Sequence, residues 1–283
     1  MEKGHAMTTK SAVREGAGSA TTGLSAREVT LSYNGDPVVR DVSVDLPTGG
    51  LTAIIGPNGS GKSTLLKAFA RVLKPDTGTI TLGGADVHAL RGKQFARQVA
   101  LLPQNPQTPP GITVRALVQR GRHPHHTLLR QWTPDDDHRI AEALAHTGLT
   151  DHADIPAAAL SGGQRQRAWI AMTLAQDTQH ILLDEPTTYL DIAHQYDLLE
   201  LCAQLHRQGR TITTVLHDLN QAAHYATQLI VLKDGRIHAE GPPAEILTPG
   251  LVSEVFGLTC DIIAHPHLGT PHLIPHPQPR ADS

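Results

Sequence analysis

Cysteine, aromatic residues and net charge are all scarce in this chain of 283 residues. Its two cysteines, Cys202 and Cys260, stand alone, which excludes a disulfide framework and fits a reducing compartment. Three Phe, two Trp and four Tyr are too few for a platform of stacked bases. A formal net charge of -3 gives no overall basic footprint, so we expect no nucleic-acid partner.

Long apolar segments are absent as well. The longest runs, such as residues 51–55, have about five residues, whereas a membrane span needs roughly 18. Residues 1–23 are small and polar, without the apolar stretch of a secretory signal, and we expect a disordered tail there. These absences predict a soluble, cytoplasmic protein that has no lipid anchor and meets any membrane through a partner protein.

Histidine, in contrast, is abundant, with 18 copies against 24 lysines and arginines. A metal-binding or sensor protein built on histidine is therefore a rival interpretation, which metal-binding and nucleotide-turnover assays would separate. Five prolines follow residue 265 and predict an irregular segment. Four histidines lie in or next to this segment: His265, His267, His272 and His276. No cysteine or acidic residue joins these histidines at zinc-site spacing, which argues against a metal site there.

The periodicity of apolar residues predicts strands that alternate with helices. Residues 24–45 have the pattern of antiparallel strands around an Asn34-Gly35 turn. Further strands are predicted at 51–55, 78–82, 99–102, 179–183, 211–216 and 229–232, the last closing an Asp234-Gly235 hairpin. Residues 113–175 lack strand signals, and Thr133-Pro134 begins a helical segment that Gly148 ends. This order predicts an α/β fold with a mainly parallel sheet and a helical insertion.

A glycine-rich segment, GPNGSGKST, follows the first buried strand and matches the phosphate-binding pattern G-x-x-x-x-G-K-[ST] in full. Glycines let successive backbone N–H groups turn toward a phosphate at the positive end of the next helix. Apolar residues at helical spacing predict that helix: Leu65, Leu66, Phe69 and Leu73. We expect Lys62 to neutralise phosphate charge and the Ser63 hydroxyl to bind Mg²⁺. The predicted nucleotide-binding set is Gly56, Pro57, Asn58, Gly59, Ser60, Gly61, Lys62, Ser63 and Thr64.

A second apolar strand ends in Asp184-Glu185. P-loop NTPases hold Mg²⁺ with an Asp at such a strand end, so we expect Asp184 on the metal side. Glu185 could then polarise an attacking water as a general base. The N-K-x-D base reader of GTPases is missing from the sequence, which favours ATP as the nucleotide.

The segment Leu160-Ser161-Gly162-Gly163-Gln164 forms a capping box and offers N–H groups at a helix N-terminus, a second anion site. This segment resembles the signature motif of ATP-binding cassette (ABC) transporters. The three motifs together resemble the nucleotide-binding subunits of that family. The resemblance covers about residues 24–258. It implies a P-loop NTPase (RecA-like) core, an N-terminal antiparallel β subdomain and an inserted α-helical subdomain at about 105–175. Residues 259–283 would form a C-terminal Pro/His-rich extension.

The resemblance also implies roles for single residues. Tyr33 in LSYNG would stack on adenine, and Asp191 in TTYLD would be the D-loop aspartate. Gln104 in LLPQN would contact Mg²⁺ and water and sense the permease. His217, after the strand TITTVL, would contact the γ-phosphate. Glu185, His217 and Gln104 would then be catalytic, and Ser63, Gln104 and Asp184 would bind Mg²⁺.

One phosphate loop and one signature motif in a chain imply a head-to-tail homodimer that holds two ATP molecules. Lys62, Ser63 and Asp184 would come from one chain, and Ser161 and Gly163 from the other. The resemblance further implies a transmembrane permease, indirectly a substrate-binding protein, and a peripheral location at the cytoplasmic face of the cell membrane. We predict the permease contact within residues 104–130, and Arg122→Glu should uncouple ATP hydrolysis from transport.

The transported substrate is indicated by finer similarity. The segments GRHPHH, DEPTTYLDIAHQ and LVSEVFGL resemble importers of ferric siderophores, with haem and vitamin B12 importers close by. The sequence has His123 at a position where an aromatic residue is frequent in that subfamily. We therefore expect uptake of an iron(III)-siderophore. The alternatives are haem, vitamin B12 or another substrate, or a non-transport ABC ATPase, although the long heptad insertion usual in DNA-repair members is missing.

Overall fold

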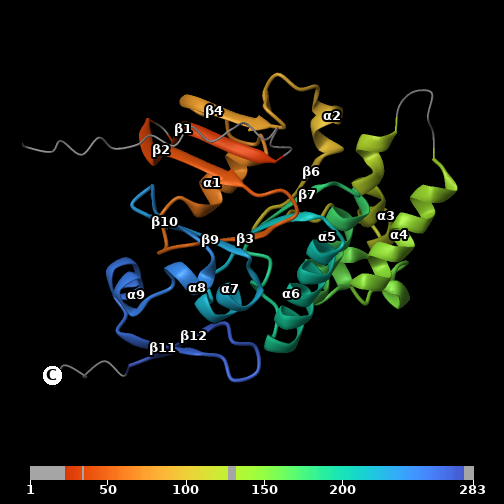
Figure 1. Cartoon of the computed structure of the whole chain (residues 1–283). Coiled ribbons are helices and arrows are strands. Elements are labelled where there is room, and N and C mark those ends of the chain that lie inside the picture. The colour runs from red at the N-terminus through yellow and green to blue at the C-terminus, as the bar shows by residue number, and fades with distance from the viewer. Residues whose placement is uncertain (1–22, 34, 127–131, 277–283) are drawn as a thin grey trace, which may run out of the picture.

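The computed structural model describes residues 23–33, 35–126 and 132–276. The tail predicted at 1–23 therefore lies outside the described residues, apart from Gly23. A six-stranded sheet forms the centre, in the order β10-β9-β3-β8-β7-β6 (Figure 1). Its parallel strands are β3 (Leu51–Ile55), β6 (Val99–Leu102), β7 (His180–Asp184), β8 (Thr211–Val215) and β9 (Gln228–Lys233), while β10 (Arg236–Gly241) runs antiparallel to β9.

Both faces of this sheet are covered, which explains why its strands are almost continuously apolar and buried. On one side lie α1 (Lys62–Phe69) and an antiparallel sheet of β1 (Leu24–Tyr33), β2 (Asp36–Leu46), β4 (Thr77–Leu82) and β5 (Ala85–Asp86). The other face packs against α6 (Ile192–Arg207), α7 (Leu219–Tyr225) and α9 (Pro249–Phe256). The short helices α2 (Gly92–Ala96) and α8 (Pro243–Ile246) complete this part.

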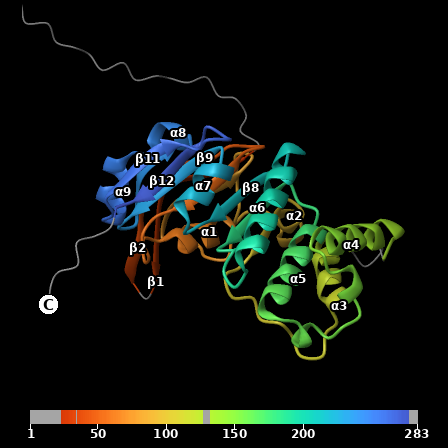
Figure 2. The same cartoon turned by 90° about the horizontal axis from the view of Figure 1, so that it is seen from below.

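The helical region projects from one end of the molecule and has its own apolar core (Figure 2). It contains α3 (Val114–Gln119), α4 (Pro134–His146) and α5 (Gly162–Ala175), with 3₁₀ turns at Arg120–His125, Thr150–His152 and Ala157–Ala159. The N-terminus of α4 lies where the sequence predicts it, because Asp136 accepts hydrogen bonds from Thr133 N and Oγ1. The antiparallel strands, the parallel sheet and the inserted helices are thus as predicted.

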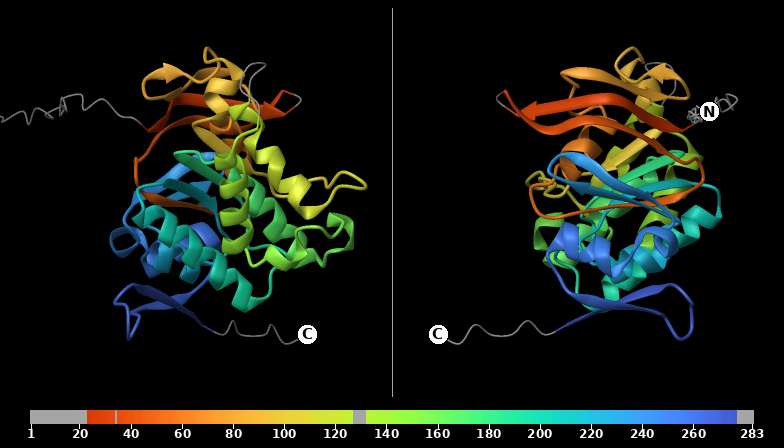
Figure 3. Two further views of the ribbon diagram at one scale, coloured as in Figure 1. Left: turned by 90° about the vertical axis from the view of Figure 1, so that its right-hand side faces the viewer. Right: turned by 60° about the vertical axis from the view of Figure 1, so that its left-hand side comes forward.

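Two local predictions are wrong. The first helix after the phosphate loop ends at Phe69 and does not reach Leu73, because Arg71 adopts a left-handed conformation (φ 60°). The segment after residue 265 is not irregular throughout. Within it, β12 (Pro271–Pro275) pairs antiparallel with β11 (Cys260–Ala264) at the end of the molecule opposite the antiparallel sheet (Figure 3).

The prolines of β12 fit because of their position in the strand. Leu273 donates its N–H away from β11, to Asn220 of α7. Backbone N–H groups alternate sides along a strand, so residues 271 and 275 also face away from β11, where a missing N–H costs no ladder bond. Over the described ranges, no helix is both long and apolar enough to cross a membrane.

Candidate functional site

The phosphate loop runs from β3 into α1, and two of its glycines are fixed by close contacts. Gly56 has φ 151°, and a Cβ there would lie 2.1 Å from the Leu232 carbonyl oxygen. Gly61 has φ 98°, and a Cβ there would lie 2.9 Å from Val39 Cγ2. Both positions therefore need glycine for steric reasons. Without side chains at these positions, the backbone of the loop can approach a ligand closely.

Lys62 is folded into this loop. Its side chain is buried, and Nζ donates to the carbonyl oxygens of Gly56 (2.9 Å) and Pro57 (2.8 Å). Burial lowers the pKa of Lys62, while the nearby carboxylates of Glu185 and Asp184 oppose that shift. Lys62, Ser63 and Thr64 line a small cavity together with Val38, Asn58, Gly59, Gly61 and Glu185. The ammonium group is thus held where an anion in that cavity would meet it.

Asp184 and Ser63 fit a magnesium ion. Ser63 Oγ donates to Asp184 Oδ1 at 2.6 Å, and Asp184 is fully buried at the end of β7. Asp184 Oδ2 is buried with no hydrogen-bond partner among the described residues. Burial raises the pKa of Asp184, against the hydrogen bond from Ser63. A buried carboxylate with a spare oxygen beside a hydroxyl suits Mg²⁺, which uses one or two carboxylates plus phosphate oxygens.

Two of the predicted catalytic residues, Gln104 and His217, contact the carboxylate of the third, Glu185. Gln104 Nε2 donates to Glu185 Oε2 at 2.6 Å, and His217 Nε2 lies 2.9 Å from Glu185 Oε1. Glu185 follows Asp184 directly, and its side chain is only 12% exposed. The β6 and β8 strands supply Gln104 and His217 just past their carboxyl ends, on either side of β7. The resemblance implied a catalytic role for each of these residues, and the sheet order explains why they lie together.

The signature segment forms the predicted capping box. Ser161 Oγ accepts from Gln164 N (3.2 Å), and Gln164 Oε1 accepts from Ser161 N (3.0 Å). Ser161 and Gly162 are exposed at the start of α5. None of residues 161–164 is among those that line the phosphate-loop cavity. Within the described chain, the signature segment and the phosphate loop are therefore separate sites.

Tyr33 and Asp191 lie at exposed positions. Tyr33 ends β1 and is 45% exposed. Asp191 caps α6, and its Oδ1 accepts from His194 N at 2.9 Å. Their proposed contacts with adenine and with a second subunit stay predictions.

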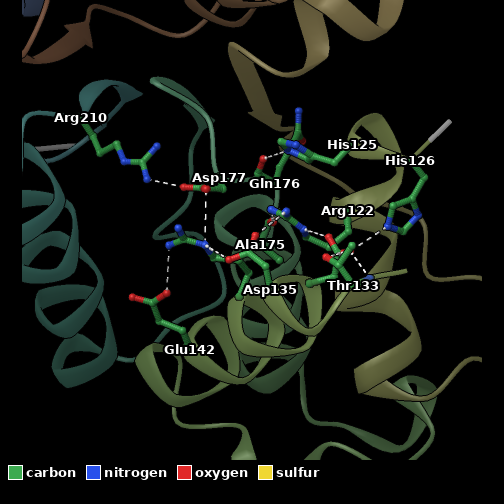
Figure 4. Close-up of polar contacts among 12 residues, drawn as sticks. Arg122, His125, His126, Thr133, Asp135, Glu142, Ala175, Gln176, Asp177 and Arg210 are labelled. Atoms are coloured by element: carbon green, nitrogen blue, oxygen red, sulfur yellow. Dashed lines mark hydrogen bonds and ion pairs between the residues drawn. The ribbon is translucent and has the colours of Figure 1, made fainter. Parts of the chain in front are cut away.

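Arg122 is not on the surface, contrary to the predicted permease contact. Its side chain is 4% exposed, Nε donates to Asp136 Oδ1 (2.8 Å) and Nη1 to Ala175 O (2.9 Å) (Figure 4). Burial raises the pKa of Asp136, but hydrogen bonds from Arg122 and Thr133 outweigh it and hold that pKa well below its usual range. His125 likewise points inward, to Gln176 O. Arg122 therefore holds the helical region together and cannot be a docking residue. Arg130 lies outside the described residues.

The histidines predicted in an irregular tail are partly gathered. His265 lies 5.6 Å from His272, 6.0 Å from His267 and 6.3 Å from His224 of α7, measured between ring centroids. No group of three or more His, Cys, Asp or Glu side chains in the described part of the chain could hold a metal ion.

Sequence reasoning missed several residues of the site. Val38 of β2 lines the phosphate-loop cavity, and Gln166 Nε2 donates to Pro186 O beside Glu185. Gln195 and Gln221 form a further contact to the same loop, described below. Their contacts were not predicted, because each joins residues of different strands, helices or loops of the fold.

A buried Asp beside a phosphate loop, followed by a Glu that contacts a Gln and a His, defines a P-loop nucleotide hydrolase. The chain belongs to the ABC transporter family, whose sequence model matches residues 39–188. It is an ATP-hydrolysing subunit of that family, and ATP with Mg²⁺ is its nucleotide ligand.

Relatives of known function are similar over most of the chain. The petrobactin import ATP-binding protein FpuD of Bacillus anthracis is 50% identical, over 89% of this chain and 93% of its own. The ferric enterobactin transport ATP-binding protein FepC of Escherichia coli is 49% identical, with the same coverage. The hemin import ATP-binding protein HmuV of Thermobifida fusca is 40% identical, over 91% of this chain and 90% of its own.

Solved structures agree on the fold. A chain of an inward-facing ABC transporter superposes with a TM-score of 0.76 at 28% identity, covering 90% of this chain and 98% of its own. A dimeric bacterial ABC transporter cassette has a TM-score of 0.70 at 27% identity, over 77% of this chain and 98% of its own.

Proposed function

We propose that this protein is the ATP-hydrolysing subunit of an importer for an iron(III)-siderophore. The grouping of Glu185 with Gln104 and His217, one residue beyond Asp184, carries the hydrolytic part of the proposal. The siderophore part rests on the similarity to proteins named for petrobactin and ferric enterobactin transport. Haem is the second candidate, because the similarity to a hemin import protein is weaker but also extends over most of the chain.

The residues divide the work as follows. The loop backbone and Lys62 bind the phosphates of ATP, and their positive charge offsets the charge that spreads over the transferred group. Ser63 and Asp184 would hold Mg²⁺, which would neutralise phosphate charge. Glu185 accepts a proton from the attacking water as the water oxygen bonds to the γ-phosphorus and the bond from that phosphorus to the β–γ bridging oxygen breaks, so that ADP leaves. Gln104 and His217 hold the Glu185 carboxylate and lie beside that water and the γ-phosphate.

The complete site needs two copies of the chain. The phosphate-loop cavity lacks any residue of the signature segment, whose exposed Gly162 at the N-terminus of α5 suits an anion from outside. A head-to-tail homodimer would place residues 161–164 of one chain on the nucleotide of the other. The similarity to a dimeric cassette supports this arrangement. ATP then favours the closed dimer because it binds both surfaces only in that state.

The permease would dock beside Gln104. A groove there is lined by residues 104–108, by Arg165 and Trp169 of α5, and by Tyr189. A partner seated in this groove would contact the segment that holds Glu185, which gives a direct route between transport and hydrolysis. The chain would thus lie at the cytoplasmic face of the membrane, bound through the permease.

The substitution Glu185→Gln tests the hydrolytic role. It removes the base and leaves the phosphate loop intact, so ATP turnover should fall by at least about a hundredfold while ATP binding and ATP-dependent dimerisation remain. Glu245→Gln is the matched control, because Glu245 is exposed on α8 away from the cavity. Undiminished turnover in Glu185→Gln would refute the assignment.

The substrate is tested by uptake in cells that lack the subunit and carry it on a plasmid. Labelled ferric siderophore should enter only with the active subunit, and Glu185→Gln should abolish that uptake. Entry of labelled haem in place of the siderophore would establish the second candidate.

A further inference from the structure

The segment between β7 and α6 carries Glu185 and Asp191 and contains two residues in a costly backbone conformation. Glu185 has φ 52° and Tyr189 has φ 69°, although neither is a glycine. Left-handed backbone is unfavourable for residues with a Cβ and persists only where surrounding contacts hold it. The shape of residues 185–191, called the catalytic loop from here on, must therefore be imposed by its neighbours.

Two glutamines bind the backbone of the catalytic loop. Gln166 of α5 donates Nε2 to Pro186 O at 3.2 Å. Gln195 of α6 donates Nε2 to Leu190 O (3.1 Å) and to Thr187 O (3.4 Å). Both are amide donors on carbonyl oxygens, so these two glutamines hold the loop through its main chain.

Gln221 determines which way the Gln195 amide faces. Its Nε2 donates to Gln195 Oε1 at 2.9 Å, and the Gln221 side chain is 5% exposed. With its oxygen taken by Gln221, Gln195 must present its NH₂ group to the loop carbonyls. Without Gln221, the Gln195 amide could rotate and place its own oxygen next to the carbonyl oxygens of Thr187 and Leu190. The hydrogen bonds to the loop would then be lost.

Gln221 itself lies on an anchored helix. Asp218, the residue after His217, caps α7 by accepting from Asn220 N and Gln221 N. The Asn220 side chain accepts from Leu273 N (2.7 Å) and donates to Leu273 O (3.2 Å), which ties the first turn of α7 to β12. An unbroken set of hydrogen bonds thus leads from the C-terminal hairpin to the loop that carries Glu185.

We propose that Gln221 is a positioning residue for ATP hydrolysis, acting through Gln195 to hold the catalytic loop, on a helix anchored by the C-terminal hairpin. The proposal rests on the hydrolytic role of Glu185 proposed above. Gln221 touches neither the nucleotide cavity nor Glu185, so its removal changes the rate of the chemical step and not the phosphate-binding loop.

The test uses steady-state ATP turnover of the full chain with Gln221→Met, Gln195→Met and the double variant. Met keeps the side-chain length and removes the amide. Each single variant should lower kcat about tenfold, the size expected when one buried hydrogen bond is lost and its partner is left unsatisfied. KM for ATP should stay within about twofold, and the double variant should lose no more than either single variant because both break the same contact.

Gln204→Met is the matched control, since Gln204 is exposed on the same helix as Gln195. A Gln221→Met protein whose melting temperature falls while kcat stays at the wild-type value would reduce Gln221 to a packing role and overturn the proposal. Losses that multiply in the double variant would also overturn it. If the wild-type turnover itself does not depend on Glu185, the proposed function fails first, so the two failures are distinguishable.

Discussion

The buried Arg122–Asp136 ion pair predicts a large and specific loss of stability. Both side chains are 4% exposed, and the pair joins the turn after α3 to the start of α4. Arg122→Met keeps much of the side-chain length but leaves the Asp136 carboxylate buried without its cation. Breaking a buried pair in this way costs about 3–5 kcal/mol. Because Thr133 still donates twice to Asp136, we expect the lower end, about 3 kcal/mol.

The assay is thermal and urea unfolding of the full chain near neutral pH. A loss of about 3 kcal/mol should lower the melting temperature by about 6 °C. Arg122→Met combined with Asp136→Leu should regain most of that loss, because no uncompensated charge then stays buried. A fully stable Arg122→Met protein that hydrolyses ATP but no longer supports transport would refute the reasoning and restore Arg122 as a docking residue.

Three smaller predictions concern pH, metal and base recognition. The folded-state pKa of Asp136 lies below its ordinary value of 3.8, so its stabilising contribution is present above that pH and lost as the pH falls. The gap in melting temperature between wild type and Asp136→Asn should therefore narrow below about pH 4, and a constant gap would contradict the ion pair. Asp184→Asn should lower Mg²⁺-dependent turnover at least about tenfold while metal-free nucleotide still binds, as measured by equilibrium dialysis. Tyr33→Ala should raise KM for ATP about three- to tenfold through lost stacking, whereas Tyr33→Phe should leave it unchanged.

The nucleotide site was largely predictable because its parts are local in sequence. The phosphate loop, the pair Asp184-Glu185 and the capping box at Ser161 each lie within a few consecutive residues. Gln104 and His217 meet at Glu185 because the carboxyl ends of parallel strands share one edge of the sheet. The sequence predicted a mainly parallel sheet but not the order of its strands, which depends on pairing between segments far apart in the chain.

Burial and long-range pairing were not predictable in this way. Arg122 looked like a surface cation, since nothing near it in sequence shows that Asp136, 14 positions away, encloses it. The contact between Gln195 and Gln221 also joins two separate helices, and nothing in the sequence marks these two side chains as partners. The prolines after residue 265 indicated an irregular segment, because the sequence does not show which N–H groups of a strand pair with a neighbour. β12 was therefore not predicted.

The outer edge of β12 offers almost nothing for another strand to bind. Of its three residues that face away from β11, Pro271 and Pro275 have no N–H, and both backbone groups of Leu273 are taken by Asn220. Open strand edges are templates for intermolecular pairing and aggregation. The asparagine side chain stands in for a neighbouring strand at the single position where one could begin. This hairpin edge is thus protected from pairing with strands of other molecules.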